Sequence, residues 1–212
     1  MPLIRRDSVP SAQAGQRRPA EVLRDGTADQ RWSAARAMGL IGDASAVAGT
    51  VKSLADALMT ESDPRVREAI FTSLVRIGGP ECVAAVIPCL RLDDPQLRGG
   101  ALDALRAMIG VVRPMLPALL SDADPDVRLL TCDLARELSA ADATRLLCDV
   151  LAHETEPNVC AAAVDVLAEI GEAEALPFLR ACAARFADVT FLDFAVRIAM
   201  QRIVAERTGP HA

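Results

Sequence analysis

Aromatic side chains are scarce in this sequence, and tyrosine is absent. Aromatic residues make up 3% of the 212 positions, whereas hydrophobic residues of all kinds make up 51%. A buried core must therefore be built from Ala, Leu, Val and Ile, a composition that suits closely packed helices. The length is sufficient for one compact domain or for one continuous array of repeats.

An excess of positive charge and long apolar runs are absent as well. The formal net charge is −6 and the pI is about 5.0. Nucleic acids and anionic membranes are bound mainly through excess Lys and Arg, so neither ligand is expected. No apolar run approaches the ~20 residues that span a bilayer, and the first 15 residues lack the apolar core of a signal peptide. We therefore expect a cytoplasmic protein.

The sequence also contains no Cys-x-x-Cys pair and no histidine cluster. Its six cysteines are spread along helical sequence, and only two histidines are present. This pattern indicates reduced, buried thiols, so no disulfide, metal or cofactor is expected. A Gly-rich phosphate loop and a Gly-x-Ser-x-Gly elbow are missing too, which argues against an enzyme. The cysteines are Cys82, Cys89, Cys132, Cys148, Cys160 and Cys182.

What the sequence does contain is a short motif that recurs along the chain. The motif opens with an acidic residue and a proline, and successive prolines are 31, 30 and 32 residues apart. A degenerate copy at Thr27 to Arg31 lies 36 residues before the first of these prolines. Regular self-similarity at this period is typical of a solenoid. The four clear copies begin at Asp63-Pro64, Asp94-Pro95, Asp124-Pro125 and Glu156-Pro157.

Each copy predicts the start of a helix. The acidic residue can cap the helix, and proline suits the first helical position, where its missing N–H costs nothing. Apolar residues then recur at helical spacing, as in Val66, Ile70 and Leu74. A glycine or polar turn should end this first helix, and a second helix should follow, bent or shortened by proline in three repeats. The expected turns lie at Gly42, Gly78-Gly79, Gly110, Ser139-Ala140 and Gly171, and the prolines are Pro88, Pro117 and Pro177.

These patterns predict an all-α fold, a right-handed α-α superhelix of about five helical pairs plus a C-terminal capping helix. Four of the five Phe fall in the last 35 residues, where an apolar helix would cover the last repeat. A dimer or partner surface is the alternative reading of that segment. We predict a disordered basic tail at 1–18, a repeat domain at 19–206 and a flexible end at 207–212. The repeats are placed near 25–60, 61–91, 92–121, 122–153 and 154–182, and the cap at 183–206.

The motif resembles the HEAT-like repeats of bacterial proteins, in particular the short repeats of phycobilin lyases. That unit has Asp-Pro-x-Val-Arg, an Ala/Leu-rich helix, an Ile-Gly-Asp turn and a second helix. The match covers about residues 25–182; Ile170-Gly171-Glu172 reproduces the turn, whereas Cys160 stands in place of the expected Arg. The resemblance implies a HEAT-like solenoid but no particular activity, because lyases, adaptors, chaperones and scaffolds share this fold.

Some polar residues invite a functional interpretation within that fold. His153-Glu154 is similar to the His-Glu pairs with which HEAT-repeat deoxyhypusine hydroxylases hold two irons, but one pair and His211 cannot complete such a site. A HEAT-like DNA glycosylase would need a basic concave face, which the second helices lack. Four arginines at one repeat position should form a ladder with cap residues such as Asp94 and Asp124, and three aspartates should form a solvated acidic ridge. The arginines are Arg31, Arg67, Arg98 and Arg128, and the aspartates are Asp103, Asp133 and Asp165.

The second helices are apolar on more than the one face needed to reach the first helices. We therefore predict a groove that receives a partner segment, with packing between adjacent repeats as the alternative. The predicted lining is Ala85, Cys89, Met115, Leu119, Leu146 and Val150, with Arg113 and Arg145 beside it.

The predicted function is a non-catalytic protein-protein interaction module, a small bacterial adaptor or regulatory scaffold. It would bind a helix or extended segment of another protein on its concave face. It would be a monomer, or a weak dimer through the Phe-rich C-terminal helix. The alternatives are a subunit or chaperone that resembles phycobilin lyases and handles a tetrapyrrole or its acceptor protein, and a structural repeat domain within a larger assembly.

Overall fold

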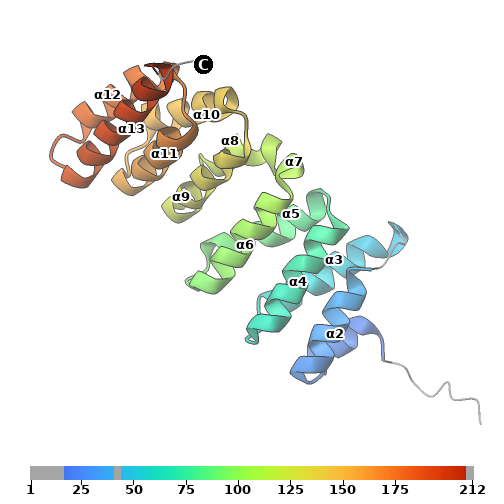
Figure 1. The fold of residues 1–212 in the computed structure, drawn as a ribbon. Helices are drawn as coiled ribbons and strands as arrows, with labels where there is room; N and C mark the ends of the chain where they lie inside the picture. The colour runs from blue at the N-terminus through green and yellow to red at the C-terminus, as the bar shows by residue number, and fades with distance from the viewer. Residues whose placement is uncertain (1–16, 41–43, 209–212) are drawn as a thin grey trace, which may run out of the picture.

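The protein is an α solenoid of two helical layers (Figure 1). The computed structural model describes residues 17–40 and 44–208, and these contain helices and turns but no strand. The first layer consists of α2 (Ala28–Met38), α4 (Pro64–Ile77), α6 (Pro95–Ala107), α9 (Pro125–Leu134), α11 (Pro157–Ile170) and α13 (Thr190–Thr208). The second layer consists of α3 (Ala44–Leu58), α5 (Pro80–Val86), α7 (Ile109–Val112), α8 (Leu116–Leu119), α10 (Ala140–His153) and α12 (Leu176–Arg185).

The repeated acidic residue caps the first helix in three of its four copies. A carboxylate oxygen accepts a hydrogen bond from a backbone N–H two residues on, at 2.9 Å, for Asp63, Asp94 and Asp124. The prediction is wrong for Glu156, whose side chain makes no capping hydrogen bond. Its extra methylene group accounts for this difference, because short side chains suit the N-cap. The degenerate copy is capped by Thr27, which forms a capping box with Gln30.

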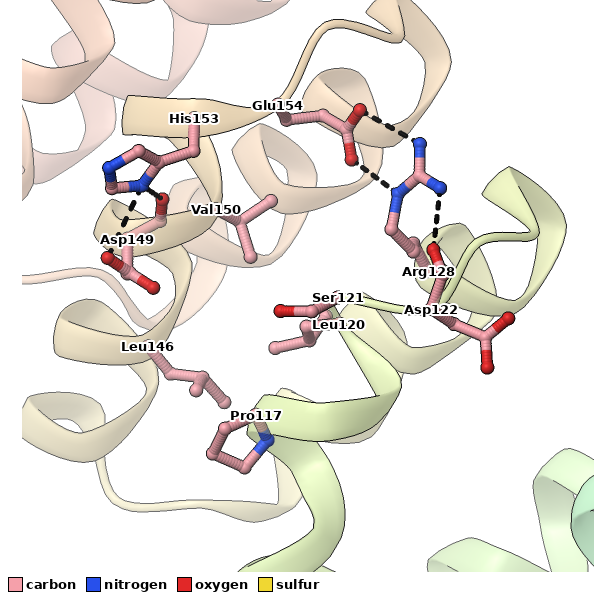
Figure 2. Close-up of a pocket in the computed structure, with 10 residues that line it drawn as sticks. All are labelled: Pro117, Leu120, Ser121, Asp122, Arg128, Leu146, Asp149, Val150, His153 and Glu154. Carbon is pink, nitrogen blue, oxygen red and sulfur yellow. Dashed lines mark hydrogen bonds and ion pairs between the residues drawn. The ribbon is translucent and has the colours of Figure 1, made fainter.

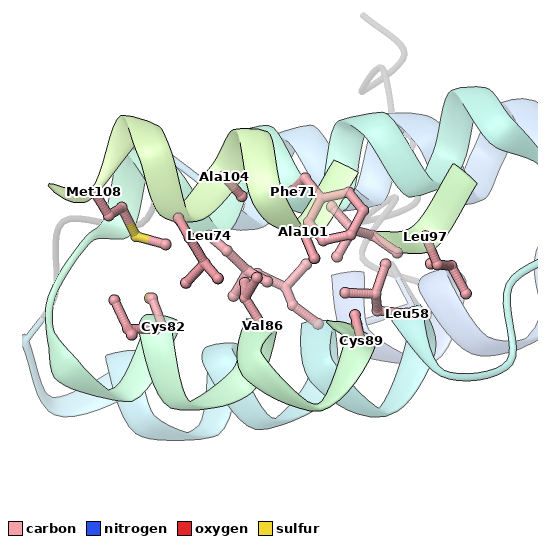
Figure 3. Packing of buried hydrophobic residues seen from close by; sticks show 14 of the residues in the cluster. Leu58, Phe71, Leu74, Cys82, Val86, Cys89, Leu97, Ala101, Ala104 and Met108 are labelled. Atoms are coloured by element: carbon pink, nitrogen blue, oxygen red, sulfur yellow. The ribbon is translucent and has the colours of Figure 1, made fainter. Parts of the chain in front are cut away.

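The core lies between the two layers, as the repeat pattern predicts (Figure 3). Val66, Ile70 and Leu74 of α4 are fully buried and pack toward the second layer. The buried side chains form two clusters, one that runs from Leu23 to Leu134 and another that runs from Leu120 to Ile203. Two partly buried side chains, Leu138 and Leu146, pack against both clusters.

The predicted turns that end the first helices are present in the described residues, with one exception. Gly78 and Gly79 end α4 with φ angles of +68° and +90°, a backbone conformation that favours glycine. Gly110 does not end a helix, because α6 stops at Ala107 and Gly110 lies inside α7. The predicted turn at Gly42 lies outside the described residues.

Proline interrupts the second layer in the second and third repeats. Pro88 lies in the 3-10 helix η1 (Ile87–Arg91) that continues α5. In the third repeat η2 (Arg113–Met115) with Pro114 separates α7 from α8, whereas the predicted Pro117 stands in the first turn of α8. Pro177 instead stands in the first turn of α12, where it breaks no backbone hydrogen bond. Two further 3-10 segments are η3 (Ala135–Glu137) and η4 (Ala173–Ala175).

A helix covers each end of the array. At the N-terminal end, α1 (Pro19–Asp25) packs against α2 and α3 and buries Leu23. At the C-terminal end, α13 packs against α11 and α12 and buries Leu192, Val196 and Ile203. This is the predicted capping helix; it continues to Thr208, beyond the predicted start of a flexible end at 207. The predicted tail, apart from its last two residues, lies outside the described residues, as do residues 209–212.

Within the described residues, no helix combines the length and the apolar character needed to cross a membrane.

Candidate protein-binding groove

The helix α10 places a ridge with one apolar and two polar side chains on the outside of the second layer. Ser139 starts this helix by accepting a hydrogen bond from the backbone N–H of Asp142 at 3.2 Å. One face of α10 is buried in the core through residues such as Leu147 and Leu151. Leu146 is only half-buried, and the exposed Asp149 and His153 follow it at positions i+3 and i+7, on the same face of the helix.

A hollow of about 350 Å³ lies on one side of this ridge, between α10 and the end of α8. Figure 2 shows Leu146 and Val150 of α10 on one side of it and Pro117 and Leu120 on the other. An ion pair between Arg128 and Glu154 closes one end of the hollow.

A larger hollow of about 880 Å³ lies between α10 and α12. Its apolar lining includes Leu146 and Phe178, and the Phe178 side chain is 38% exposed. The two hollows share four lining residues, so they meet along the ridge of α10. We refer to both hollows together as the α10 groove. The shared residues are Pro117, Leu146, Asp149 and His153.

The rim of the α10 groove is acidic. Asp149, Glu172 and Glu174 line the larger hollow, and within the described part of the chain none of them pairs with a Lys or Arg. The His153 side chain lies beside this rim, with its Nδ1 3.5 Å from Asp149 Oδ1. Arg145 also lines the hollow, but its guanidinium pairs with Asp142.

In the ion pair at the end of the smaller hollow, Glu154 is buried and Arg128 is partly buried. Arg128 Nε lies 2.7 Å from Glu154 Oε2, and Arg128 Nη2 lies 3.0 Å from Oε1. Glu154 Oε1 also accepts hydrogen bonds from the backbone N–H groups of Thr155 and Glu156. Burial opposes the charged form of Glu154, but these hydrogen bonds outweigh it and hold the pKa of that carboxyl below its usual range.

The arginine ladder exists, but its partners differ from those predicted. Arg67 pairs with the cap residue Asp94 at 2.9 Å, as expected. Arg31 and Arg128 instead pair with Glu61 and Glu154, each of which lies two residues before a cap. Arg98 approaches Asp126 at 3.4 Å, so the predicted partnership with Asp124 is wrong. The shared position of the two glutamates is the sequence signal that would have identified them.

The predicted acidic ridge is also wrong, because arginines lie between its aspartates. Arg106 bridges Asp103 and Asp133, with distances of 2.6 and 2.5 Å. Arg136 bridges Asp133 and Asp165, at 2.8 and 2.6 Å, and also pairs with Glu169. We call this row the outer ladder; it consists of Asp103, Arg106, Asp133, Arg136, Asp165 and Glu169 on the first layer.

The predicted groove residues divide into two sets. Leu146 lines both hollows, Val150 contributes to the smaller one and Arg145 to the larger one. Cys89 and Leu119 are buried in the core and present no surface to a partner. Ala85 and Met115 are half-buried against the same core, and the exposed Arg113 pairs with Asp142. Sequence reasoning missed Pro117, Asp149, His153 and Phe178 as members of the groove.

The groove offers little to metal or nucleophilic chemistry. Across residues 17–40 and 44–208, no three His, Cys, Asp or Glu side chains converge on a common point that could hold a metal ion. All six cysteines are free and buried. Cys148 lies in the lining of the larger hollow, but burial, with a smaller contribution from Glu174, raises its pKa to about 11. A thiol with so high a pKa is a poor nucleophile at neutral pH.

Comparisons with solved structures find other helical repeat proteins. A designed armadillo repeat protein is 17% identical, with 87% of this chain and 98% of that chain covered and a TM-score of 0.41. The S. pombe condensin Cnd3-Cnd2 subcomplex is 17% identical, with 90% and 27% covered and a TM-score of 0.43. The complex of CpcE and CpcF of phycocyanin lyase from Nostoc sp. PCC7120 is 18% identical, with 94% and 100% covered and a TM-score of 0.35.

No curated protein matches the sequence. The family model for HEAT repeats, in contrast, matches residues 19–107 and 112–190, which is most of the chain. The stacked helical pairs and their capped helix starts agree with this match. The chain therefore belongs to the family of HEAT-repeat proteins.

Proposed function

We propose that this protein is a non-catalytic interaction module that binds a segment of another protein in the α10 groove. The observation that carries the proposal is the half-buried Leu146, the apolar part of a ridge that has a hollow on each side. Amphipathic helices bind in grooves of this kind through apolar side chains spaced along one face. The acidic rim formed by Asp149, Glu172 and Glu174 favours a segment whose apolar face is flanked by Lys or Arg.

The biological setting that fits this proposal is a small bacterial adaptor or regulatory scaffold in the cytoplasm. The reduced, buried cysteines support a reducing compartment. The high pKa of Cys148 supports a binding role for the groove, because the nearest thiol is held in its neutral form.

The size of the larger hollow favours a second candidate. A volume of about 880 Å³ lies within the range of small-molecule sites, about 300–1,000 Å³. A subunit or chaperone that handles a tetrapyrrole or its acceptor protein, as in phycobilin lyases, would need such a space. The carboxylates of the rim weigh against this candidate, because a tetrapyrrole carries carboxylates of its own and like charges repel.

Two substitutions at neighbouring positions test the groove. Leu146→Glu places a charge that water can solvate in the free protein but that a bound partner must desolvate. It should abolish capture of the partner from native extract and lower the melting temperature far less than Leu147→Glu does, because Leu146 is half-buried and not fully buried. Leu147→Glu places the same charge in the core, since Leu147 is fully buried, and should unfold the protein.

A third variant controls for a general loss of surface hydrophobicity. Met59 is 46% exposed and lies outside both hollows, so Met59→Glu should leave capture intact. Equal capture by Leu146→Glu and the native protein would contradict the proposal. Absorbance titration with a bilin tests the second candidate function, which predicts a saturable spectral change on binding of the bilin.

A further inference from the structure

A second cleft lies on the first layer, between α2 and α4, and contains the sole Trp of the chain. Its volume is about 630 Å³. Trp32 is 37% exposed, and the guanidinium carbon of Arg36 lies 4.6 Å from the centre of its ring. Arg76 of α4 lines the same cleft. Trp and Arg are the side chains most enriched among residues that dominate binding energy at protein interfaces.

The outer ladder stops before it reaches this cleft. Counted from the start of each first helix, the position of Asp103, Asp133 and Asp165 is occupied by Thr72 in α4 and by Arg36 in α2. Arg76 stands in the last turn of α4, one position later than Arg106 in α6 when both are counted from the start of the helix. Arg106 has carboxylate partners on both sides, whereas Arg76 lacks the equivalent of Asp103.

Neither Arg36 nor Arg76 has a carboxylate within ion-pair distance among the described residues. Most arginines of the described residues form ion pairs, and Arg36 and Arg76 are among the few that do not. The third arginine of the cleft, Arg65, is already engaged by Asp63 and Asp29. The cleft therefore presents two guanidinium groups and an aromatic ring where the next two repeats present paired charges.

The charges around the cleft select among anionic ligands. Asp29 and Glu68 also line it, and the whole chain has a net charge of −6. A continuous phosphate backbone would be repelled by these groups, since it needs a uniformly basic track. Single carboxylates on a polypeptide can be placed between the acidic groups, and an apolar side chain beside them can pack on Trp32. Guanidinium groups match carboxylates in geometry and are weakly hydrated.

We propose that the α2–α4 cleft binds an acidic segment of another protein, whose carboxylates pair with Arg36 and Arg76 and complete the outer ladder. This surface belongs to the first layer, so the proposal does not depend on the α10 groove.

The fluorescence of Trp32 reports binding directly, because no other Trp is present. The probe is a synthetic peptide in which Glu pairs alternate with single Leu residues. We expect a saturable change in Trp32 emission that weakens as salt is added. Arg36→Glu and Arg76→Glu should each weaken binding at least tenfold. Arg180→Glu is the matched control, because Arg180 is exposed on α12 and has no ion-pair partner among the described residues.

A second variant tests the ladder without removing an arginine. Thr72→Asp supplies the missing carboxylate four residues before Arg76, where the two side chains can pair. It should raise the melting temperature slightly and weaken binding of the peptide tenfold or more. Peptide binding that is unchanged by Thr72→Asp, or lost equally in Arg180→Glu, would overturn the proposal. So would tighter binding of a single-stranded oligonucleotide than of the peptide.

Discussion

Gly100 of α6 lies against the ring of Phe71 in α4, so closely that a β-carbon on residue 100 would stand 2.6 Å from Phe71 Cε2. The adjacent Gly99 faces open space. Phe71 is the one phenylalanine of the chain that is buried in the core. The absence of a side chain at residue 100 is therefore what allows an aromatic ring between the second and third repeats of an otherwise aliphatic core.

The two glycines should respond in opposite directions to the same substitution. Gly99→Ala should raise the free energy of unfolding by about 0.5–1 kcal/mol, because alanine favours the helix and meets no neighbour. Gly100→Ala should lower it by about 1–3 kcal/mol, because the ring or the helix must shift. Chemical denaturation measures both. In a Phe71→Leu background the cost of Gly100→Ala should shrink, and an unchanged cost would show that the ring is not the cause.

Helix capping should depend on the length of the acidic side chain. Asp124→Ala should lower the free energy of unfolding by about 0.5–2 kcal/mol, since Asp124 accepts a hydrogen bond from the backbone of Asp126. Glu156→Ala removes no capping hydrogen bond and should change stability much less. Equal effects at the two positions, measured by thermal or chemical denaturation, would contradict this account.

The buried ion pair should matter far more than an exposed one. Glu154→Gln removes the counter-charge of the partly buried Arg128 guanidinium and should cost about 1.5–3 kcal/mol of unfolding free energy. Lys52→Ala removes the exposed pair between Lys52 and Asp56 and should leave stability nearly unchanged. Denaturant midpoints of the two variants against the native protein give the comparison.

Stability should fall in acid through the same carboxylates. Hydrogen bonds from Arg31 and from the backbone hold the pKa of Glu61 below its ordinary value of 4.5, and the pKa of Glu154 is lowered as well. Their contribution is therefore complete above about pH 4.5 and is lost as pH falls through the lowered native pKa values. The double variant Glu61→Gln/Glu154→Gln should show a flatter decline in melting temperature below pH 4.5. A decline as steep as that of the native protein would assign the acid sensitivity to other groups.

The cysteines should react slowly in the folded protein. Burial raises the pKa of Cys89 to about 11 and that of Cys132 to about 12, so the reactive thiolate of these two residues is rare at neutral pH. The other four thiols are buried as well, which limits access of a reagent. With a thiol reagent at pH 8, the native protein should react slowly and the denatured protein should yield six thiols without reductant. Fewer than six would indicate oxidation or a bound metal.

The fold was predictable because the motif fixes both the helix start and the core face. An acidic residue and a proline determine where α4 begins, and the spacing of Val66, Ile70 and Leu74 determines which side is buried. Interactions between repeats were less predictable. Sequence position places Asp133 on an outer face, but it does not show that Arg106, one repeat earlier, can reach it.

The groove was only partly predictable for a different reason. Counting apolar residues along a second helix assumes one continuous helical phase. In the third repeat η2 separates α7 from α8, so the phase is not kept, and Leu119 turns into the core. In the uninterrupted α10 the assumption holds better, and Leu146 lies in the groove while Val150 is buried at its edge.

The division of the core into two clusters has a mechanical consequence. Side chains pack continuously within each cluster and less so between the two, so the array should bend most easily where the clusters meet. Leu146 packs against both clusters and is also the ridge of the α10 groove. A segment bound there would contact Leu146, which packs against both halves of the array. We therefore expect its binding to fix the angle between the two ends of the array, so that an event at α10 changes the distance from α2 to α13.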